Sequence, residues 1–151
     1  LDPLELVSLN QIINDAAAIT ADQLKSKKIT FRIIPFLDLQ IHCRPNQITQ
    51  VMLNLISNAI DAIESQVSPW IQIEVRVGAE VDIFVTDSGT GIAPETVKKM
   101  MDPFFTTKSI HKGTGLGLSI SYGIVKDHNG LLYYNPNCSN TQFVIRLPIS
   151  H

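Results

Sequence analysis

The sequence lacks most features that mark specialised classes of protein. It contains only two cysteines, Cys43 and Cys138, too few for a disulfide framework and without the spacing of a zinc site. We therefore expect two reduced thiols in a cytoplasmic protein. No apolar run reaches the roughly 18–20 residues that a membrane-spanning helix needs. The net charge is only −2, so nothing indicates nucleic acid or an anionic membrane as a partner.

What the chain does have is enough apolar material for one hydrophobic core. Its 151 residues, 44% of them hydrophobic, are typical of a single globular domain. Residues 1–5 are acidic rather than basic, so we expect no signal peptide. Because the first residue is not Met, we expect a fragment of a longer protein. We interpret residues 1–151 as one domain.

The spacing of apolar residues predicts an alternation of helices and strands. Helices are expected over about 10–27, 45–63, 94–101 and 116–128. Strands are expected over 6–9, 29–36, 38–43, 70–77, 81–87, 131–134 and 142–147, with 29–36 and 38–43 forming either two separate strands or a hairpin. Asn10 is expected to cap the first helix, and Ile19 and Ile120 to face the core. The order predicts an α/β fold with helices layered on a mixed sheet.

The helix expected over 45–63 carries two asparagines at its centre. Asn54 and Asn58 are four residues apart, so their side chains stack one turn above the other, and Asp61 follows near the same stripe. Asparagine is a weak helix former, so this apolar helix gains no stability from the pair. For a lone asparagine a surface amide is the simpler interpretation, and the choice for the pair depends on the sequence downstream.

Asp87 ends a predicted strand and begins the stretch Asp87-Ser88-Gly89-Thr90-Gly91-Ile92. Gly89 and Gly91 allow a tight turn and a close approach of a ligand to the backbone. A carboxylate at this place can accept a hydrogen bond from an exocyclic amine such as that of adenine. An ordinary turn explains the stretch equally well when it is taken alone.

Two later stretches have the chemistry of phosphate binding. In Phe104-Phe105-Thr106-Thr107-Lys108, two hydroxyls and an ammonium suit phosphate oxygens, although a hydrophobic loop plug explains the pattern better if it stands alone. In Gly113-Thr114-Gly115-Leu116-Gly117-Leu118, glycine amides directly precede a helix, where N–H groups and the helix dipole favour an anion. The spacing is neither the dinucleotide fingerprint nor a P-loop.

In order and spacing the four stretches together resemble the ATP-binding catalytic domain of sensor histidine kinases, whose N, G1, F and G2 boxes they match. The resemblance runs from about Leu6 to Pro148. The wording Asn-Ala-Ile-Asp-Ala and Phe-Phe-Thr-Thr-Lys is similar to the nitrogen-regulation and oxygen-sensor branch. The resemblance implies the Bergerat fold, a histidine kinase/gyrase-type two-layer sandwich with one mixed sheet covered on one face by three helices. Residues 1–8 would be the remnant of a linker from a missing phosphoacceptor helical domain.

The resemblance also implies a site for ATP and Mg²⁺. Asn58 and Asn54 would hold the metal, which suits oxygen ligands. Asp87 would hold the adenine amine, with Thr141 as a second contact. Residues 102–115 would form a mobile ATP lid, on which Lys108 meets the phosphates, so that Asn58 and Lys108 are the catalytic residues. The other ATP-binding residues implied are Gly89, Gly91, Ile92, Phe104, Thr106, Thr107, Gly113, Thr114, Gly115, Leu116, Gly117 and Leu118.

The chain departs from the family pattern at two points. Asp61 stands where many members have Lys or His, and a carboxylate cannot contact phosphate directly, so we expect it to lie behind the residues that do. Lys108 is then the expected cationic contact, ahead of Lys112 and His111. The second departure is that no histidine has the His-Glu or His-Asp context of a phosphoacceptor. We expect exposed side chains at His42, His111 and His128.

Three functions remain open at this stage. The leading one is phosphoryl transfer from ATP to a histidine on a separate domain of the same protein, in a two-component system with a response regulator downstream. The second is ATP hydrolysis, as in gyrase, the ninety-kilodalton heat-shock chaperone or the mismatch-repair ATPase. Those relatives place a Glu where Asn54 stands, and an amide cannot take a proton from water. The third is a non-catalytic nucleotide-sensing module. No nucleic acid and no direct membrane contact are expected.

Overall fold

The structure, a computed structural model, describes residues 3–100 and 117–149. None of the helices in this part of the chain is long and apolar enough to cross a membrane. In chain order the elements are β1 (Glu5–Ser8), α1 (Leu9–Ser26), β2 (Thr30–Ile33), β3 (Gln40–Cys43), α2 (Pro45–Ile63), β4 (Trp70–Val77), β5 (Glu80–Asp87), α3 (Pro94–Met100), α4 (Gly117–Asp127), β6 (Leu131–Tyr134) and β7 (Thr141–Pro148).

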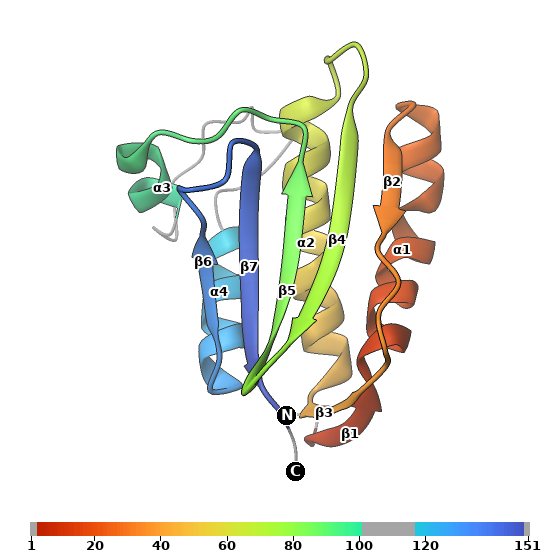
Figure 1. Cartoon of the computed structure of the whole chain (residues 1–151), viewed down its shortest axis with the longest axis vertical. Helices are drawn as coiled ribbons and strands as arrows, with labels where there is room; N and C mark the ends of the chain where they lie inside the picture. Colours follow the sequence, from red (N-terminus) through yellow and green to blue (C-terminus); the bar gives the residue numbers. More distant parts are fainter. Residues whose placement is uncertain (1–2, 101–116, 150–151) are drawn as a thin grey trace.

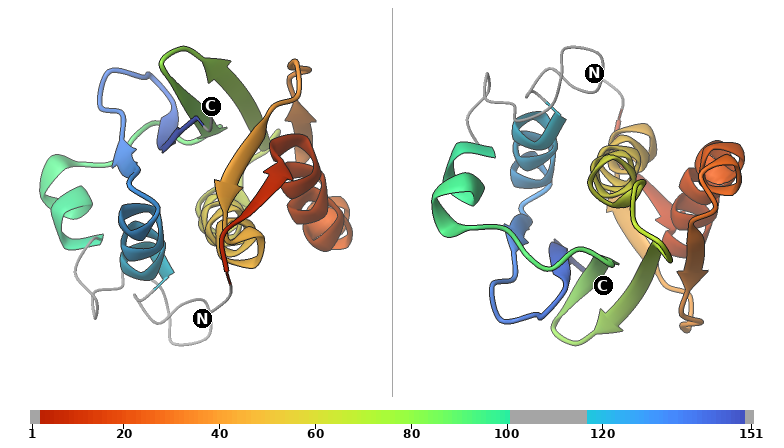
Figure 2. Two further views of the ribbon diagram at one scale, coloured as in Figure 1. Left: turned by 90° about the horizontal axis from the view of Figure 1, so that it is seen from below. Right: turned by 90° about the horizontal axis from the view of Figure 1, so that it is seen from above.

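One mixed sheet organises the molecule. Its strand order is β2-β4-β5-β7-β6, in which β2 runs parallel to β4 and the other pairs are antiparallel. Helices α1, α2 and α4 cover one face of this sheet, while α3 lies at the margin beyond β6 and α4 (Figures 1 and 2). The predicted sandwich of one mixed sheet and three covering helices is therefore confirmed. The small helix α3 and a two-stranded sheet of β1 and β3 are added to it.

The two strands that follow α1 do not form a hairpin. β2 joins the large sheet beside β4. The pairing extends one residue past β2, where the amide of Ile34 donates to the carbonyl of Ile73 at 2.9 Å. β3 pairs instead with β1, in a register that sets Leu6 opposite His42. Of the two arrangements that the sequence allowed, separate strands is the correct one.

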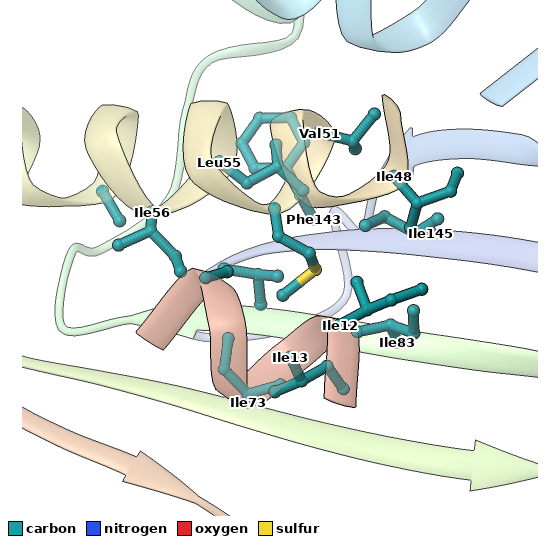
Figure 3. Close-up of a cluster of buried hydrophobic side chains, with 14 of the residues drawn as sticks. Ile12, Ile13, Ile48, Val51, Leu55, Ile56, Ile73, Ile83, Phe143 and Ile145 are labelled. Carbon is teal, nitrogen blue, oxygen red and sulfur yellow. The ribbon is translucent and has the colours of Figure 1, made fainter. Parts of the chain in front are cut away.

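The core lies between the sheet and α1 and α2, and isoleucine is its most frequent residue. The alternation of β4 and β5 points Ile71, Ile73 and Ile83 towards the helices, and each is at most 1% exposed. Figure 3 shows Ile73 and Ile83 beside side chains of α1 and α2. Burying each such side chain contributes roughly 1.5–3 kcal/mol. The large side chains that are almost fully buried are Leu9, Ile13, Ile41, Ile48, Met52, Ile56, Ile60, Ile63, Ile71, Ile73, Ile83 and Leu132.

The start of α1 corrects one prediction from the sequence. Ser8, not Asn10, caps the helix: its hydroxyl oxygen accepts from the amide of Gln11 at 3.1 Å. Ser8 can do so because it has the extended conformation of β1. The amide of Asn10 donates to the Asp38 carboxylate at 2.9 Å, and the Ser8 hydroxyl donates to the same carboxylate at 2.6 Å. A residue of a later loop therefore completes the cap.

Two isoleucines expected in the core are exposed instead. Ile19 is 65% exposed, and the neighbouring Thr20 is buried in its place, with its hydroxyl donating to the carbonyl of Ala16 at 2.9 Å. Ile120 is 44% exposed because the buried face of α4 runs through Leu118, Ser121 and Val125. In both helices a small polar residue packs where the sequence pattern predicted an apolar one.

Candidate nucleotide-binding site

The first half of the site is built around Asp87. Alternation along β5 points this side chain to the helix-covered face, as it does Val85, and the residue opposite it on β7 is Thr141. Asp87 is only 5% exposed. Burial raises the pKa of its carboxyl group to about 6, against the opposing effect of a hydrogen bond that it accepts from the Gly89 amide at 2.7 Å. A buried acid at a strand end can bind an exocyclic amine.

The two glycines after Asp87 are required by the shape of the turn. A Cβ on Gly89 would lie 2.7 Å from both the Asp87 carboxylate and the Thr141 hydroxyl. Gly91 has φ +102°, a conformation that side chains disfavour, and its amide donates to the Thr141 hydroxyl at 3.0 Å. The structure therefore brings together Asp87, Gly89, Gly91 and Thr141, four of the residues that were predicted to bind ATP.

Three residues that sequence reasoning missed hold this turn in place. The Ser88 hydroxyl accepts from the amide of Trp70 at 3.1 Å and donates to the side chain of Gln66, just past α2. From the other side, the Asn140 amide group donates to the Gly89 carbonyl at 3.2 Å. Ser88 could have been noticed as a hydroxyl between two site residues. Gln66 and Asn140 carry no signal, because they are distant from Asp87 in the sequence.

The second half of the site joins α2 to the start of α4. The side-chain nitrogen of Asn54 donates to the Gly117 carbonyl at 3.3 Å and to the Ser121 hydroxyl at 3.0 Å. An amide nitrogen has two hydrogens, so both are engaged and the carbonyl oxygen is the remaining polar atom of the side chain. Amide oxygen is a ligand that Mg²⁺ accepts, so Asn54 fits a metal site. Ser121, which is fully buried, was not predicted.

Asn58 lies one turn further along α2 and is half-buried. The helix extends over Pro45–Ile63, as predicted, so Asn54, Asn58 and Asp61 share one side of it. The core stripe of the same helix, including Leu55 and Ala59, is buried directly beside them. The polar stripe therefore lies at the border between the core and the surface.

The two halves of the site are connected through the core. Leu55 follows Asn54 on α2, and Phe143 follows Thr141 by two residues on β7. Both apolar side chains belong to one buried cluster, which also includes Leu118 of α4. The polar groups of α2, α4 and the sheet end are therefore fixed to a common core.

The predicted lid over 102–115 lies outside the described part of the chain. The predicted contacts that lie outside it are Phe104, Thr106, Thr107, Lys108, His111, Lys112, Gly113, Thr114, Gly115 and Leu116. Of that glycine stretch the structure describes Gly117, where a Cβ would lie 3.9 Å from the Asn54 side chain, and Leu118, which is in the core. Within residues 3–100 and 117–149, no cluster of three or more His, Cys, Asp or Glu is placed to hold a metal ion.

The histidines divide differently from the expectation. His42 is exposed, as predicted, but His128 is 6% exposed and the prediction for it is wrong. Its Nε2 accepts from the Arg44 amide at 3.0 Å, and its Nδ1 lies 2.7 Å from the Ile124 carbonyl. Because a backbone amide can only donate, we assign the proton of a neutral imidazole to Nδ1. His128 is a buried structural link.

The chain is similar in sequence to known proteins of one family. The family model described as histidine kinase-, DNA gyrase B- and HSP90-like ATPase matches residues 43–151. The sensor histidine kinase ZraS of Escherichia coli K12 is 36% identical over 149 residues, which cover 97% of this chain and 31% of that protein. Sporulation kinase E of Bacillus subtilis is 31% identical, over 93% of this chain and 19% of that protein. The chain thus spans a third or less of the length of these curated relatives.

Among solved structures, the catalytic domain of the histidine kinase ThkA superposes with a TM-score of 0.82 at 31% identity, covering 95% of each chain. ThkA in complex with the response regulator TrrA gives a TM-score of 0.80 at 28% identity, covering 97% of this chain and 42% of that one. The mycobacterial sensor histidine kinase MprB has the same fold, with a TM-score of 0.82 at 23% identity, over 96% of this chain and 97% of that one.

Proposed function

Because the chain belongs to the family of histidine kinase-, DNA gyrase B- and HSP90-like ATPases, we propose that it is the ATP-binding catalytic domain of a sensor histidine kinase. It would transfer the γ-phosphoryl group of ATP to a histidine on a separate dimerisation domain of the same protein. The observation that carries the proposal is the buried Asp87 cradle, closed by Gly89 and Thr141 on the sheet face that the amide-bearing helix α2 covers.

In this proposal the base binds at the sheet end. The Asp87 carboxylate accepts a hydrogen bond from the adenine amine, which offsets the cost of burying its charge. Gly91 and Ile92 line the base pocket with backbone atoms, and the Thr141 hydroxyl is the second polar contact. The glycines leave room for the base because neither bears a Cβ.

The phosphates bind between α2 and α4. Asn54 and Asn58 hold Mg²⁺, which when bound neutralises the charge of the phosphate chain. Lys108 and the glycines at 113, 115 and 117 would supply the remaining phosphate contacts and the lid. The protein's own residues contribute by positioning the nucleotide. The hydrogen bond between Asn54 and Ser121 keeps α2 and α4 joined while the nucleotide lies between the sheet end and the helices.

Transfer to a protein histidine is favoured over hydrolysis by the chemistry of Asn54. An amide cannot take a proton from water, and the nitrogen of this one is held by Gly117 and Ser121. As further parts of the proposal, residues 1–151 form one catalytic domain, and residues 1–8, of which Glu5–Ser8 pairs with β3, are the remnant of a linker from the phosphoacceptor domain. A response regulator acts downstream. The nitrogen-regulation and oxygen-sensor branch stays a prediction.

Calorimetry tests the nucleotide site directly. The chain should bind ADP in the presence of Mg²⁺, and ATP should be hydrolysed only slowly. Rapid hydrolysis would favour the hydrolase alternative. Asn58→Ala should weaken Mg-ADP binding, whereas Asn46→Ala, an exposed asparagine in the first turn of the same helix, should not. An unchanged affinity in Asn58→Ala would remove Asn58 from the site.

Transfer is tested in the longer protein that contains the acceptor domain. ATP labelled in the γ-phosphoryl group should give an acid-labile phosphohistidine. Nucleotide binding without any such product would favour the non-catalytic sensing module.

A further inference from the structure

The loop that follows Asp87 is held by side chains from two other strands. On the β7 side, the Gly89 carbonyl accepts from the amide of Thr141 at 3.1 Å, and the Gly91 amide donates to the Thr141 hydroxyl at 3.0 Å. These bonds fix the first half of the loop. They do not reach the Ile92 amide, so this end of the Gly91–Ile92 segment, which the proposed function places against the base, depends on another support.

That support is Tyr134 at the end of β6. Its hydroxyl oxygen accepts a hydrogen bond from the Ile92 amide at 2.8 Å. The fit is close, because a Cβ on Gly91 would lie 3.1 Å from the same oxygen. A single phenol therefore meets both residues of the segment, 42 positions away in the chain.

The ring of Tyr134 lies on the same face of the sheet as Asp87 and Thr141. Tyr134 pairs with Phe143 across β6 and β7, and the two rings meet edge to face, with centroids 5.4 Å apart. Phe143 is a core residue on the helix-covered face, which is also the face of Asp87 and Thr141. Since neighbouring residues of a strand point to opposite faces, Tyr133 lies on the other side of the sheet.

We propose that Tyr134 is a positioning residue for the nucleotide base. Its hydroxyl holds the Gly91–Ile92 backbone in the conformation that lines the base pocket, while its ring, packed on Phe143, sets where that hydroxyl lies. The inference rests on the proposed function and adds to it a residue from β6, a strand to which neither the sequence patterns nor the comparisons assign a role.

The test compares Tyr134→Phe with Tyr133→Phe. The first substitution removes one oxygen and keeps the ring on Phe143, and the second removes the same atom on the opposite face of the sheet. Calorimetry should show Mg-ADP binding about 3- to 10-fold weaker in Tyr134→Phe, the effect of one lost hydrogen bond. Amide hydrogen exchange at Ile92 should speed up in this variant alone. Mg-tripolyphosphate has no base, so its dissociation constant, measured by displacement of ADP, should be the same in Tyr134→Phe as in wild type.

Each alternative outcome has a definite meaning. If wild type binds ADP and Tyr134→Phe binds it equally well, Tyr134 does not position the base. A loss shared equally by ADP and tripolyphosphate would make Tyr134 a general support of the fold and overturn the inference. If the wild-type chain binds no ADP, the proposed function itself fails, and this inference fails with it.

Discussion

The imidazole of His128 accepts a hydrogen bond from the backbone amide of Arg44, 84 residues earlier in the chain. Arg44 precedes the first turn of α2, and His128 follows the last turn of α4, where its other nitrogen donates to the Ile124 carbonyl. One neutral side chain therefore connects the start of one site helix to the end of the other. It is a second link between α2 and α4, besides the bonds of Asn54 to Gly117 and Ser121.

Replacing His128 by Ala should lower the free energy of unfolding by about 2–4 kcal/mol, because it leaves a part-buried amide without its partner and opens a gap in the packing. Denaturant unfolding measures the loss. His42→Ala, at an exposed imidazole, should change stability by no more than about 0.5 kcal/mol. Equal effects of the two substitutions would contradict the structural role of His128.

Asp87 should make the stability of the protein fall as the pH rises from about 4 to about 6. Because its pKa is raised to about 6 by burial, the native state keeps this proton over a range in which the unfolded chain has released it. The stabilising contribution is present below the unfolded pKa and is lost as the pH passes the folded one. Asp87→Asn removes the charge, so the variant should be roughly 2–3 kcal/mol more stable than wild type at pH 8 and similar to it at pH 4.

The same substitution should abolish measurable ADP binding, since an amide nitrogen at this place cannot accept from the adenine amine. Wild type should also bind ADP more weakly below about pH 6, where Asp87 becomes protonated. Thermal unfolding measures the stability, and calorimetry measures the ADP affinity, of both proteins over the same pH range. An Asp87→Asn variant that loses stability at pH 8 would show that the buried charge is not a cost.

Asn54→Asp should loosen the junction between α2 and α4. A carboxylate cannot donate to the Gly117 carbonyl or the Ser121 hydroxyl oxygen, and at Gly117 it would face another acceptor. We expect a loss of about 1–3 kcal/mol in stability and faster amide exchange in the first turn of α4. Ser57→Ala, at an exposed position of the same helix, is the matched control. Unaltered exchange in α4 would mean that Asn54 does not hold the two helices together.

The two cysteines should react with a thiol reagent in two distinct phases. Cys43 is 1% exposed, and burial raises the pKa of its thiol to about 11, so it forms little of the reactive thiolate. Cys138 is half-buried. At pH 8 the reagent should therefore modify Cys138 readily in the native protein, and Cys43 only when denaturant is added. Cys138→Ser should leave the native protein unreactive, and rapid labelling of that variant would show that Cys43 is accessible.

Asp38 should stabilise α1 at neutral pH and lose that effect in acid. Hydrogen bonds from the Ser8 hydroxyl and then from the Asn10 amide lower the pKa of its carboxyl group. A lowered pKa means that the contribution is present above the ordinary value and disappears as the pH falls through the folded value. Asp38→Ala should cost about 1 kcal/mol at pH 7, whereas Asp22→Ala, exposed on the same helix, should cost little. An equal loss in both variants would assign Asp38 no capping role.

The layers of the fold and the acid-glycine turn could be predicted from the sequence because both depend on local patterns. The run from Pro45 to Ile63 has the helical period and a proline at its start, and its observed bounds are those predicted. Asp87, Gly89 and Gly91 lie within five residues, so a short stretch of sequence contains most of the base cradle.

The supports of the site could not be predicted because they join distant parts of the chain. Tyr134 reaches Ile92, and Asn140 reaches Gly89, only because β7 pairs with β5 and β6 pairs with β7. The predicted cap of α1 is wrong because Ser8 takes the extended conformation of β1, a strand that pairs with the distant β3, and because Asp38, 28 residues beyond Asn10, accepts from the Asn10 amide. His128 gave no sign of burial, because its two partners are backbone atoms.

Strand β7 follows β5 and β6 in the chain, yet in the sheet it lies between them. While the ribosome is still adding residues 141–148, β5 and β6 have no partner between them, and each exposes a row of amide and carbonyl groups. The cradle of Asp87, Gly89 and Thr141 can therefore form only after β7 has been made, when Thr141 pairs opposite Asp87.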